Sequence, residues 1–211
     1  MNAPGPSLTR MTSRDEQREQ TRARVEEAAI EAFAEHGYEG ASTRDIATRA
    51  DISHGLLSYH FESKAELWRA AADRLFTDVA DVLDIDADDE EPDGDTARES
   101  VRAFVRLNAR RPELFHFMTD AGRRDDERMR YLVESHLRRR FAGVAGVNPS
   151  GIDPAHVYYA LAGAASLLFG VAPECRSLTG LDPSGDDVVE RHADYLLSLI
   201  HISEPTRHRR I

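Results

Sequence analysis

The polar side chains in the stretch 41–64 are of types that bind nucleic acid. Thr43 and Lys64 stand at the starts of two expected helices, where free backbone N–H groups and the helix dipole favour an anion such as a phosphate. Between them, Ser58 can donate to or accept from a base edge, and Tyr59 offers a hydroxyl group or a contact to a thymine methyl group. The stretch therefore indicates binding to a nucleic-acid surface.

Two short helices separated by a tight turn are expected to position these side chains. Ser42 suits the N-cap of the first helix, with Asp45 three residues later, and Ser53 suits the N-cap of the second helix, His54–Tyr59. Ser63 repeats the capping pattern before a longer helix. This is the plan of a helix-turn-helix unit, in which the second helix enters the DNA major groove.

The second short helix carries small and polar residues on the face expected to meet bases. Gly55 lets the backbone approach closely, and the helix contains no arginine, so each base contact is expected to be modest. A dimer that reads two half-sites would double the number of such contacts and so compensate for their modest strength. Of three large apolar residues, Leu56 and Phe61 are expected in the core, whereas Leu57 is placed with the groove-facing residues.

The residues from Arg24 to Leu67 resemble the DNA-binding domain of TetR-family transcription regulators. The matching landmarks stand at the spacings of that family: Ala28-Ala29, Phe33, Gly37-Tyr38, Ser42-Thr43, Asp45-Ile46-Ala47, Ser53, Gly55, His60-Phe61, Ser63-Lys64 and Leu67. Two positions depart from the pattern, since Ser58 stands where the family usually has tyrosine and Asp51 where its inter-helix turn usually has glycine.

The resemblance implies a ligand-responsive DNA-binding regulator, with phosphate contacts at Thr43, His60 and Lys64. Together with the helix reading, it gives the expected DNA-binding residues: Thr43, Arg44, Ser53, His54, Gly55, Leu57, Ser58, Tyr59, His60 and Lys64. The implied action is repression from a pseudo-palindromic operator bound by a homodimer. Activation is a variant of the same reading that the sequence does not separate from it.

The whole chain is expected to be all-α, because no strand-like alternation occurs in it. Its expected parts follow in order: a disordered arm at 1–13, the helix-turn-helix domain at 14–66, a linking helix and acidic loop at 67–95, an effector-binding and dimerisation domain at 96–196, and a tail at 197–211 that is not native. The tail contains Leu197–Arg207, which resembles the in-frame translation of a sequencing adapter. A genuine basic tail is the alternative.

Two late helices are expected to form the dimer interface, because the resembled family joins its subunits through a four-helix bundle there. Asp153-Pro154 opens the first, which is apolar nearly all round and is therefore expected to be buried. The second carries its apolar stripe over Val188–Leu196. The alternative is that this pair forms the internal core of a monomer.

Aromatic and soft side chains in the second domain indicate a pocket for an apolar effector. The expected lining residues, with polar groups among them, are Phe104, Asn108, Phe115, Met118, Tyr131, His136 and Tyr159. Each of these taken alone fits a core position as well as a pocket. The chemical identity of the effector does not follow from these residues.

Composition excludes several other classes. The formal net charge of −11 over 211 residues argues against a protein that coats nucleic acid, although a local basic face could still bind DNA. A single cysteine, Cys175, fits a reducing cytoplasm. The longest apolar run, Tyr158–Ala172, is shorter than the about 20 residues needed to span a bilayer, so no membrane partner is expected.

No arrangement typical of an enzyme is present. The sequence has no H-E-x-x-H, no G-x-S-x-G and no phosphate-binding glycine loop, and its histidines are scattered. We therefore expect no catalysis, no cofactor and no metal site. The main alternative to a DNA-binding regulator is a ligand-binding or dimerisation protein of the same fold that does not read DNA.

Overall fold

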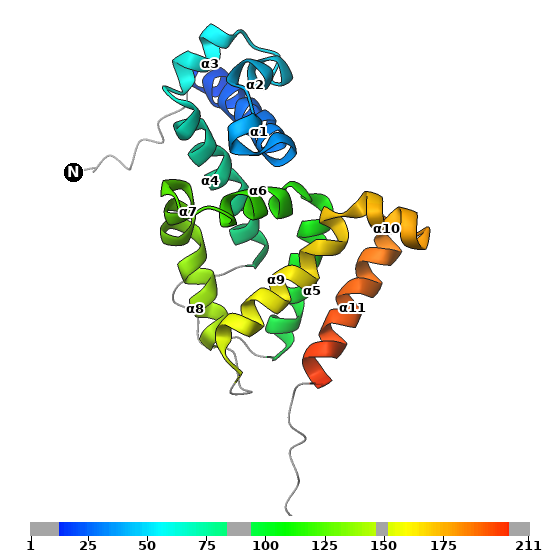
Figure 1. The fold of residues 1–211 in the computed structure, drawn as a ribbon. Helices are drawn as coiled ribbons and strands as arrows, with labels where there is room; N and C mark the ends of the chain where they lie inside the picture. Colours follow the sequence, from blue (N-terminus) through cyan, green and yellow to red (C-terminus); the bar gives the residue numbers. More distant parts are fainter. Residues whose placement is uncertain (1–12, 84–93, 147–151, 203–211) are drawn as a thin grey trace, which may run out of the picture.

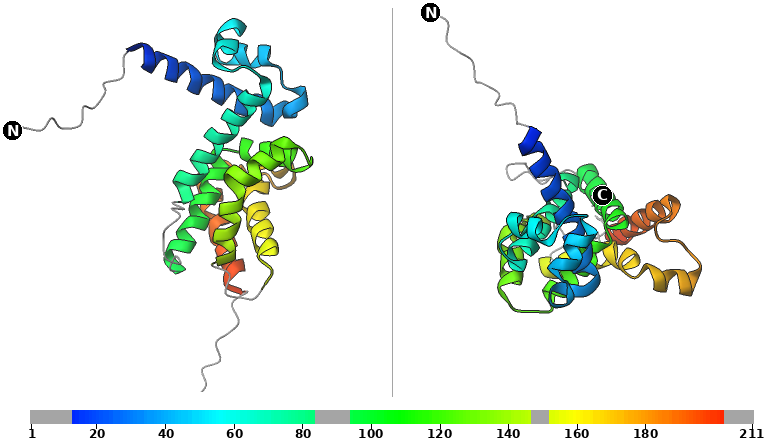
Figure 2. Two further views of the ribbon diagram at one scale, coloured as in Figure 1. Left: turned by 90° about the vertical axis from the view of Figure 1, so that its left-hand side faces the viewer. Right: turned by 90° about the horizontal axis from the view of Figure 1, so that it is seen from above.

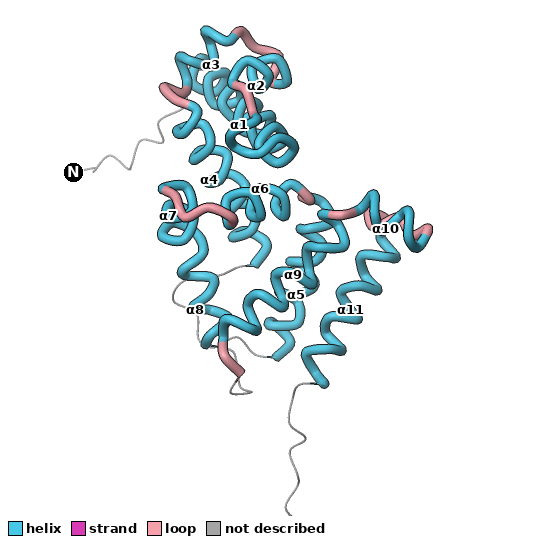
Figure 3. Tube along the Cα trace, viewed as in Figure 1, coloured by secondary structure: helices cyan, strands magenta, loops and turns pink. Residues whose placement is uncertain are grey.

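The structure, a computed structural model, describes residues 13–83, 94–146 and 152–202. These residues form helices joined by turns, and they contain no strand, as Figure 3 shows. The predicted all-α fold class is confirmed. The prediction for residues 1–12 of the arm and for residues 84–93 of the acidic loop lies outside the described residues.

The N-terminal helices gather at one end of the molecule, and α4 runs from them into the rest of the chain (Figures 1 and 2). These helices are α1 (Ser13–Gly40), α2 (Thr43–Arg49), α3 (His54–His60) and α4 (Lys64–Leu83). The remaining helices are α5 (Gly94–Arg110), α6 (Glu113–Gly122), α7 (Glu127–Leu132), the π-helical turn η1 (Val133–Leu137), α8 (Arg138–Gly146), α9 (Pro154–Gly170), α10 (Ala172–Thr179) and α11 (Asp186–Ile202).

Three serines begin the helices of the N-terminal end, as the sequence predicts. The Ser42 hydroxyl accepts from the Arg44 N–H at 3.3 Å, the Ser53 hydroxyl from the Leu56 N–H at 3.2 Å, and the Ser63 hydroxyl from the Glu66 N–H at 3.0 Å. These bonds satisfy backbone N–H groups that have no partner inside their own helix. Sequence alone therefore determines where α2, α3 and α4 start.

Two residues between helices have the left-handed backbone that their positions require. Asp51, in the turn between α2 and α3, has a φ of 52°, so this turn has the geometry for which glycine is usual. Gly37 has a φ of 66° and a ψ of 172°, which ends the regular part of α1 three residues before Gly40. Its position at this bend also brings it against α6, because a Cβ at Gly37 would lie 2.9 Å from Asp120 Oδ1.

One hydrophobic core joins the helix-turn-helix to the helices that follow it. Its buried residues come from α1, α2, α3 and α4 and also from α5, α6 and α7. Four rings lie at the junction: Phe117 of α6 stacks on Trp68 of α4 with centroids 5.0 Å apart and meets Phe33 of α1 edge-on, while Tyr38 stacks on Phe33. The division into separate domains at 66/67 and 95/96 stays a prediction.

A second, smaller core lies between α5, α9 and α11, with Val105, Phe169 and Ala193 at its centre. The prediction that α9 is buried nearly all round is wrong for the single chain, because only Ala165, Phe169 and Gly170 of that helix are buried. Within the described part of the chain no helix covers the opposite face of α9, and large apolar side chains there are exposed.

Two segments of the C-terminal part, the one after Met129 and the last helix, differ from the pattern of apolar residues in the sequence. The apolar stripe after Met129 does not form one α-helix, because the π-helical turn η1 interrupts it. The last helix, α11, continues past Leu196 to Ile202, into the segment that resembles adapter sequence, whose status stays a prediction. No single described helix is long and apolar enough to cross a membrane, and α9 and α10 pass that test only as a pair bent by 73°.

We predict that Gly37→Ala lowers the free energy of unfolding by about 1–3 kcal/mol, because an L-residue is strained at this φ and ψ. The added methyl group would also push Asp120 away from the Tyr38 N–H, to which its Oδ2 is bonded at 3.0 Å. Gly143→Ala, at an exposed helical position of α8 with open space around it, is the matched control and should stabilise by about 0.5–1 kcal/mol. Urea titration measures both, and equal stability of the two variants would contradict this reading.

Candidate nucleic-acid interface

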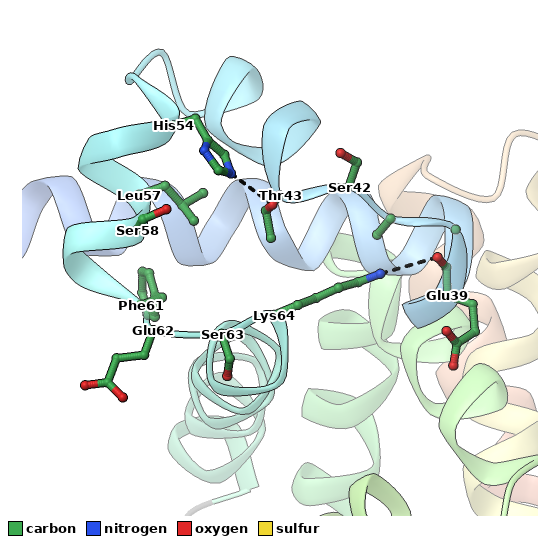
Figure 4. Close-up of a pocket in the computed structure, with 12 residues that line it drawn as sticks. Glu39, Ser42, Thr43, His54, Leu57, Ser58, Phe61, Glu62, Ser63 and Lys64 are labelled. Atoms are coloured by element: carbon green, nitrogen blue, oxygen red, sulfur yellow. Dashed lines mark hydrogen bonds between the residues drawn. The ribbon is translucent and has the colours of Figure 1, made fainter.

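A shallow hollow of about 560 Å³ lies where α1 ends and where α2, α3 and α4 begin (Figure 4). Its lining includes Thr43, His54, Ser58 and Lys64, which were four of the residues expected to bind DNA. The sequence brings them together because two N-cap residues, Ser42 and Ser63, line the hollow, together with His54, the first residue of α3. Free helix N–H groups and polar side chains at one place suit the binding of phosphate oxygens.

A hydrogen bond joins the first residues of the two short helices. Thr43 Oγ1 and His54 Nε2 are 3.2 Å apart, and both side chains point into the hollow in Figure 4. His54 is exposed, so a phosphate could reach its ring as well. The contact holds the start of α3 against the start of α2 and positions both polar groups for one ligand.

Lys64 crosses the hollow from the start of α4 towards the end of α1. Its ammonium group donates to the backbone oxygen of Glu39 at 3.3 Å and lies 4.8 Å from the ring centroid of Tyr38. An ammonium group has three N–H donors, so the bond to Glu39 leaves capacity for a phosphate oxygen. Tyr38, which stacks on Phe33, thus also orients the lysine.

The outward face of α3 presents the residues expected to read bases. Tyr59 is 71% exposed, His54, Gly55 and Ser58 are exposed, and no atom lies within 4 Å of a Cβ built on Gly55. This backbone surface can come close to a groove. Whether each side chain contacts DNA stays a prediction.

The two leucines of α3 are placed the opposite way round from the prediction. Leu57 is only 2% exposed and packs in the main core, so its side chain does not face the groove as expected. Leu56 is 39% exposed, although it was expected in the core. Which leucine is buried depends on how the seven-residue helix α3 is rotated about its own axis. Phe61, at 2% exposure, is buried as predicted.

Of the other expected DNA-binding residues, Arg44 is exposed on α2, and Ser53 uses its hydroxyl oxygen to cap α3. The sequence reading missed a contribution from α1. The Arg18 guanidinium lies 5.9 Å from the ring centroid of Tyr59, and that of Arg22 lies 4.6 Å from the ring centroid of Phe61. No local signal in α1 marks these arginines, because the contact depends on how α1 crosses α3.

Burial lowers the pKa of His60, and the nearby positive charges of Arg18 and Arg22 lower it further. His60 is therefore neutral near pH 7 in the free protein. A phosphate beside the ring would favour the imidazolium form, so binding at this position would take up a proton.

The residues expected to line an effector pocket do not gather around one described hollow. The Asn108 side chain is buried and donates to the Phe104 carbonyl oxygen at 2.8 Å, while Phe115 packs against Gly170 and Met118 against the main core. Tyr131 and His136 both bond Asp73 of α4. Tyr159 is 73% exposed on the uncovered face of α9, so it lines no enclosed pocket within the single chain, and its part in an effector site stays a prediction.

Comparisons with known proteins agree with the geometry of this end of the molecule. The family model described as bacterial regulatory proteins, tetR family, matches residues 27–77. The HTH-type transcriptional repressor Rv3405c of Mycobacterium tuberculosis is 32% identical over 179 residues, which cover 81% of this chain and 84% of that protein. The HTH-type transcriptional repressor SCO4008 of Streptomyces coelicolor is 35% identical over 79 residues, 37% of this chain and 40% of that protein.

Solved structures show the same fold over most of the chain. A TetR-like transcriptional regulator from Rhodococcus sp. RHA1 has a TM-score of 0.60 at 20% identity and covers 93% of this chain and 100% of its own. A transcriptional regulator from Aquifex aeolicus VF5 has a TM-score of 0.58 at 21% identity, covering 85% of this chain and 99% of its own. These likenesses extend the shared fold beyond the matched 27–77 segment.

We predict that affinity for DNA rises as the pH falls through the ordinary histidine range, because bound phosphate raises a His60 pKa that is lowered in the free protein. The gain is about tenfold for each unit of that rise, and it ends below the pKa of the free protein. His60→Gln should lose most of this dependence. Fluorescence anisotropy between about pH 7.5 and about pH 5.5 measures it, with His116→Gln, an exposed histidine of α6 outside the hollow, as the control, and an unchanged profile in His60→Gln would rule the contact out.

Proposed function

Because the chain belongs to the TetR family of helix-turn-helix transcriptional regulators, we propose that it binds a pseudo-palindromic DNA operator as a homodimer and represses transcription there. The observation that carries this proposal is the junction of three capped helix starts beside the exposed face of α3. The hollow offers phosphate contacts that fix the register of the helix, and Ser58 and Tyr59 face outward to read base edges.

Local charge supports DNA binding by a chain whose net charge is −11. Arg18, Arg22, Arg44 and Lys64 lie on or next to this face. Since exposed charges more than about 10 Å away are largely screened at ordinary salt, the acidic surface elsewhere weakens binding only slightly. DNA binding is expected to weaken steeply with added salt.

The homodimer is supported by the uncovered face of α9 and the outer face of α11. Tyr159 and Leu167 of α9 are 73% and 52% exposed, and Tyr195 of α11 is 59% exposed. Gly163 lies on the same face with no atom within 4 Å of a built Cβ, which would let a partner helix approach closely. A second copy that packs its own α9 and α11 here would cover these side chains and form a four-helix bundle.

We further propose that a small molecule bound among the C-terminal helices controls the operator complex, and that the protein acts in the cytoplasm without catalysing a reaction. The helix α4 connects the two parts, so a change in its tilt would change the distance between two α3 helices in a dimer. A ligand that prefers one distance would shift the population of dimers away from the other. Activation in place of repression would use the same geometry.

The experiment that tests DNA reading is fluorescence anisotropy with the intergenic duplex beside the gene for this protein, with unrelated duplex and a salt series as controls. Lys64→Met should weaken binding to every duplex alike and reduce the slope of log affinity against log salt by about 1. Tyr59→Ala should reduce the preference for the selected duplex by about 1–3 kcal/mol with little change in that slope.

A wild-type dimer that is folded but binds no duplex would contradict the proposal. It would instead favour a protein of this fold that binds ligands or forms dimers without reading DNA. Equal effects of Lys64→Met and Tyr59→Ala on salt slope and on selectivity would contradict the division into phosphate and base contacts.

We predict that Leu167→Glu converts the dimer to a monomer at micromolar concentration, because two carboxylates would be buried across the two-fold axis without partners. Leu56→Glu is the matched control, since Leu56 is an exposed leucine of α3 at the other end of the molecule. Analytical ultracentrifugation should show a monomer for the first variant and a dimer for the second. A dimer in both would place the interface elsewhere.

A further inference from the structure

Arg140, in the first turn of α8, is a partly buried cation without a carboxylate partner among the described residues. The hydrogen bonds of its guanidinium go to backbone oxygens: Nη1 donates to the His136 carbonyl oxygen, and Nη2 donates to the Phe76 carbonyl oxygen of α4 at 2.9 Å. None of the ion pairs within the described part of the chain includes it. Burial lowers the pKa of this guanidinium, because it is partly removed from water.

One donor of this guanidinium has no acceptor at all. The Nε atom of Arg140 is fully buried and makes no hydrogen bond. A buried charged donor without a partner costs several kcal/mol, so such groups are usually paired with an anion. The Nε–H and one Nη2–H form one edge of the planar fork, and that edge matches the two oxygens of a carboxylate.

The side chains around this cation are aromatic. The guanidinium lies 5.0 Å from the ring centroid of Phe76, and the His136 ring stacks on Phe76 with centroids 4.7 Å apart. Phe141 follows Arg140 directly and meets the Tyr158 ring of α9 edge-on at 5.7 Å. The charge of Arg140 also acts on the Tyr158 phenol, so α4, η1, α8 and α9 all contribute to one setting.

Among the described residues, no carboxylate acts on this guanidinium. Asp73 lies on α4, but its Oδ1 atom accepts both from the Tyr131 hydroxyl at 2.6 Å and from His136 Nε2 at 2.8 Å. The other charge that acts on Arg140 comes from Arg139, which has the same sign. A cation bounded by aromatic rings and backbone oxygens fits a ligand with an anionic group on an apolar body.

We propose that Arg140 binds the carboxylate of an aromatic organic acid, which is the effector of this regulator. For this the guanidinium must turn so that the edge formed by Nη2 and the now buried Nε faces the ligand carboxylate, and the ligand ring then lies against Phe76, Phe141 and Tyr158. That this ligand acts as an effector rests on the proposed function, in which a small molecule controls the operator complex. The binding site itself stands on the contacts of Arg140.

The same contacts couple the ligand to DNA binding. The Phe76 carbonyl oxygen belongs to α4, the helix that carries the helix-turn-helix, and a charged carboxylate is the stronger acceptor for Nη2. A bound acid therefore competes with α4 for Arg140 and loosens one of its ties to η1 and α8. Other contacts of α4 with this region are the hydrogen bonds of Asp73 with His136 and Tyr131 and the stacking of Phe76 on His136.

The test is isothermal titration calorimetry of the full chain with naphthalene-2-carboxylate and with the neutral isostere naphthalene-2-carboxamide. Wild type should bind the acid at least about tenfold more tightly than the amide, the size expected for charge-assisted hydrogen bonds. Arg140→Met should abolish that preference, and Arg140→Lys, which keeps the charge but not the planar fork, should retain only part of it. Arg139→Met, at the exposed neighbouring position, is the matched control and should behave as wild type.

Equal binding of acid and amide, no binding of the acid at millimolar concentration, or a preserved preference in Arg140→Met would each overturn the proposal. Circular dichroism of each variant shows whether it is folded, and the wild-type comparison of acid with amide decides the matter even if Arg140→Met is not. DNA binding by the ligand-free protein is measured separately. A chain that binds DNA but shows no preference for the acid contradicts this inference alone.

Discussion

The packing of Phe117 between Trp68 and Phe33 is the interaction on which the rest of the structure depends. Its ring stacks on Trp68 with an interplanar angle of 16° and meets Phe33 at 82°, so α6 is fixed against α4 and α1 at one point. Each such ring buries a large apolar area, and the pairs add about 0.5–1.5 kcal/mol beyond burial. Because close-packed cores transmit strain, this shared core couples the helix-turn-helix to the first C-terminal helices.

Polar contacts around these rings fix the same orientation. The Asp120 carboxylate of α6 accepts from the Tyr38 N–H, and the Arg128 guanidinium lies 4.0 Å from the ring centroid of Tyr38. Glu27 of α1 accepts hydrogen bonds from Arg74 of α4 and Arg111. The Tyr38 ring also contacts the Lys64 ammonium group. A displacement of α6 would therefore move Tyr38 and, through it, Lys64 in the phosphate-binding hollow. Signals from the C-terminal helices therefore have two routes to the DNA face, one through α6 and one through α4.

Local sequence predicted the helix starts, the left-handed turn at Asp51 and the polar face of α3, because N-caps and turn residues act within three or four positions. It failed for Leu56 and Leu57, since both suit a core and only the rotation of α3 on α1 decides between them. It also failed for α9, whose apolar composition predicts burial but does not say whether the covering helix belongs to the same chain. The contacts of Arg18 with Tyr59 and of Arg140 with Phe76 join separate helices, so no spacing in the sequence reveals them.

In a homodimer without bound ligand, this core fixes each helix-turn-helix to the C-terminal helices and should hold the two α3 helices at one distance. Selection of bound duplexes from a random pool, followed by sequencing, measures that distance most directly. The account predicts enrichment of one inverted repeat with a single half-site spacing. Enrichment of single half-sites, of repeats with variable spacing, or of no sequence at all from a folded dimer would contradict it.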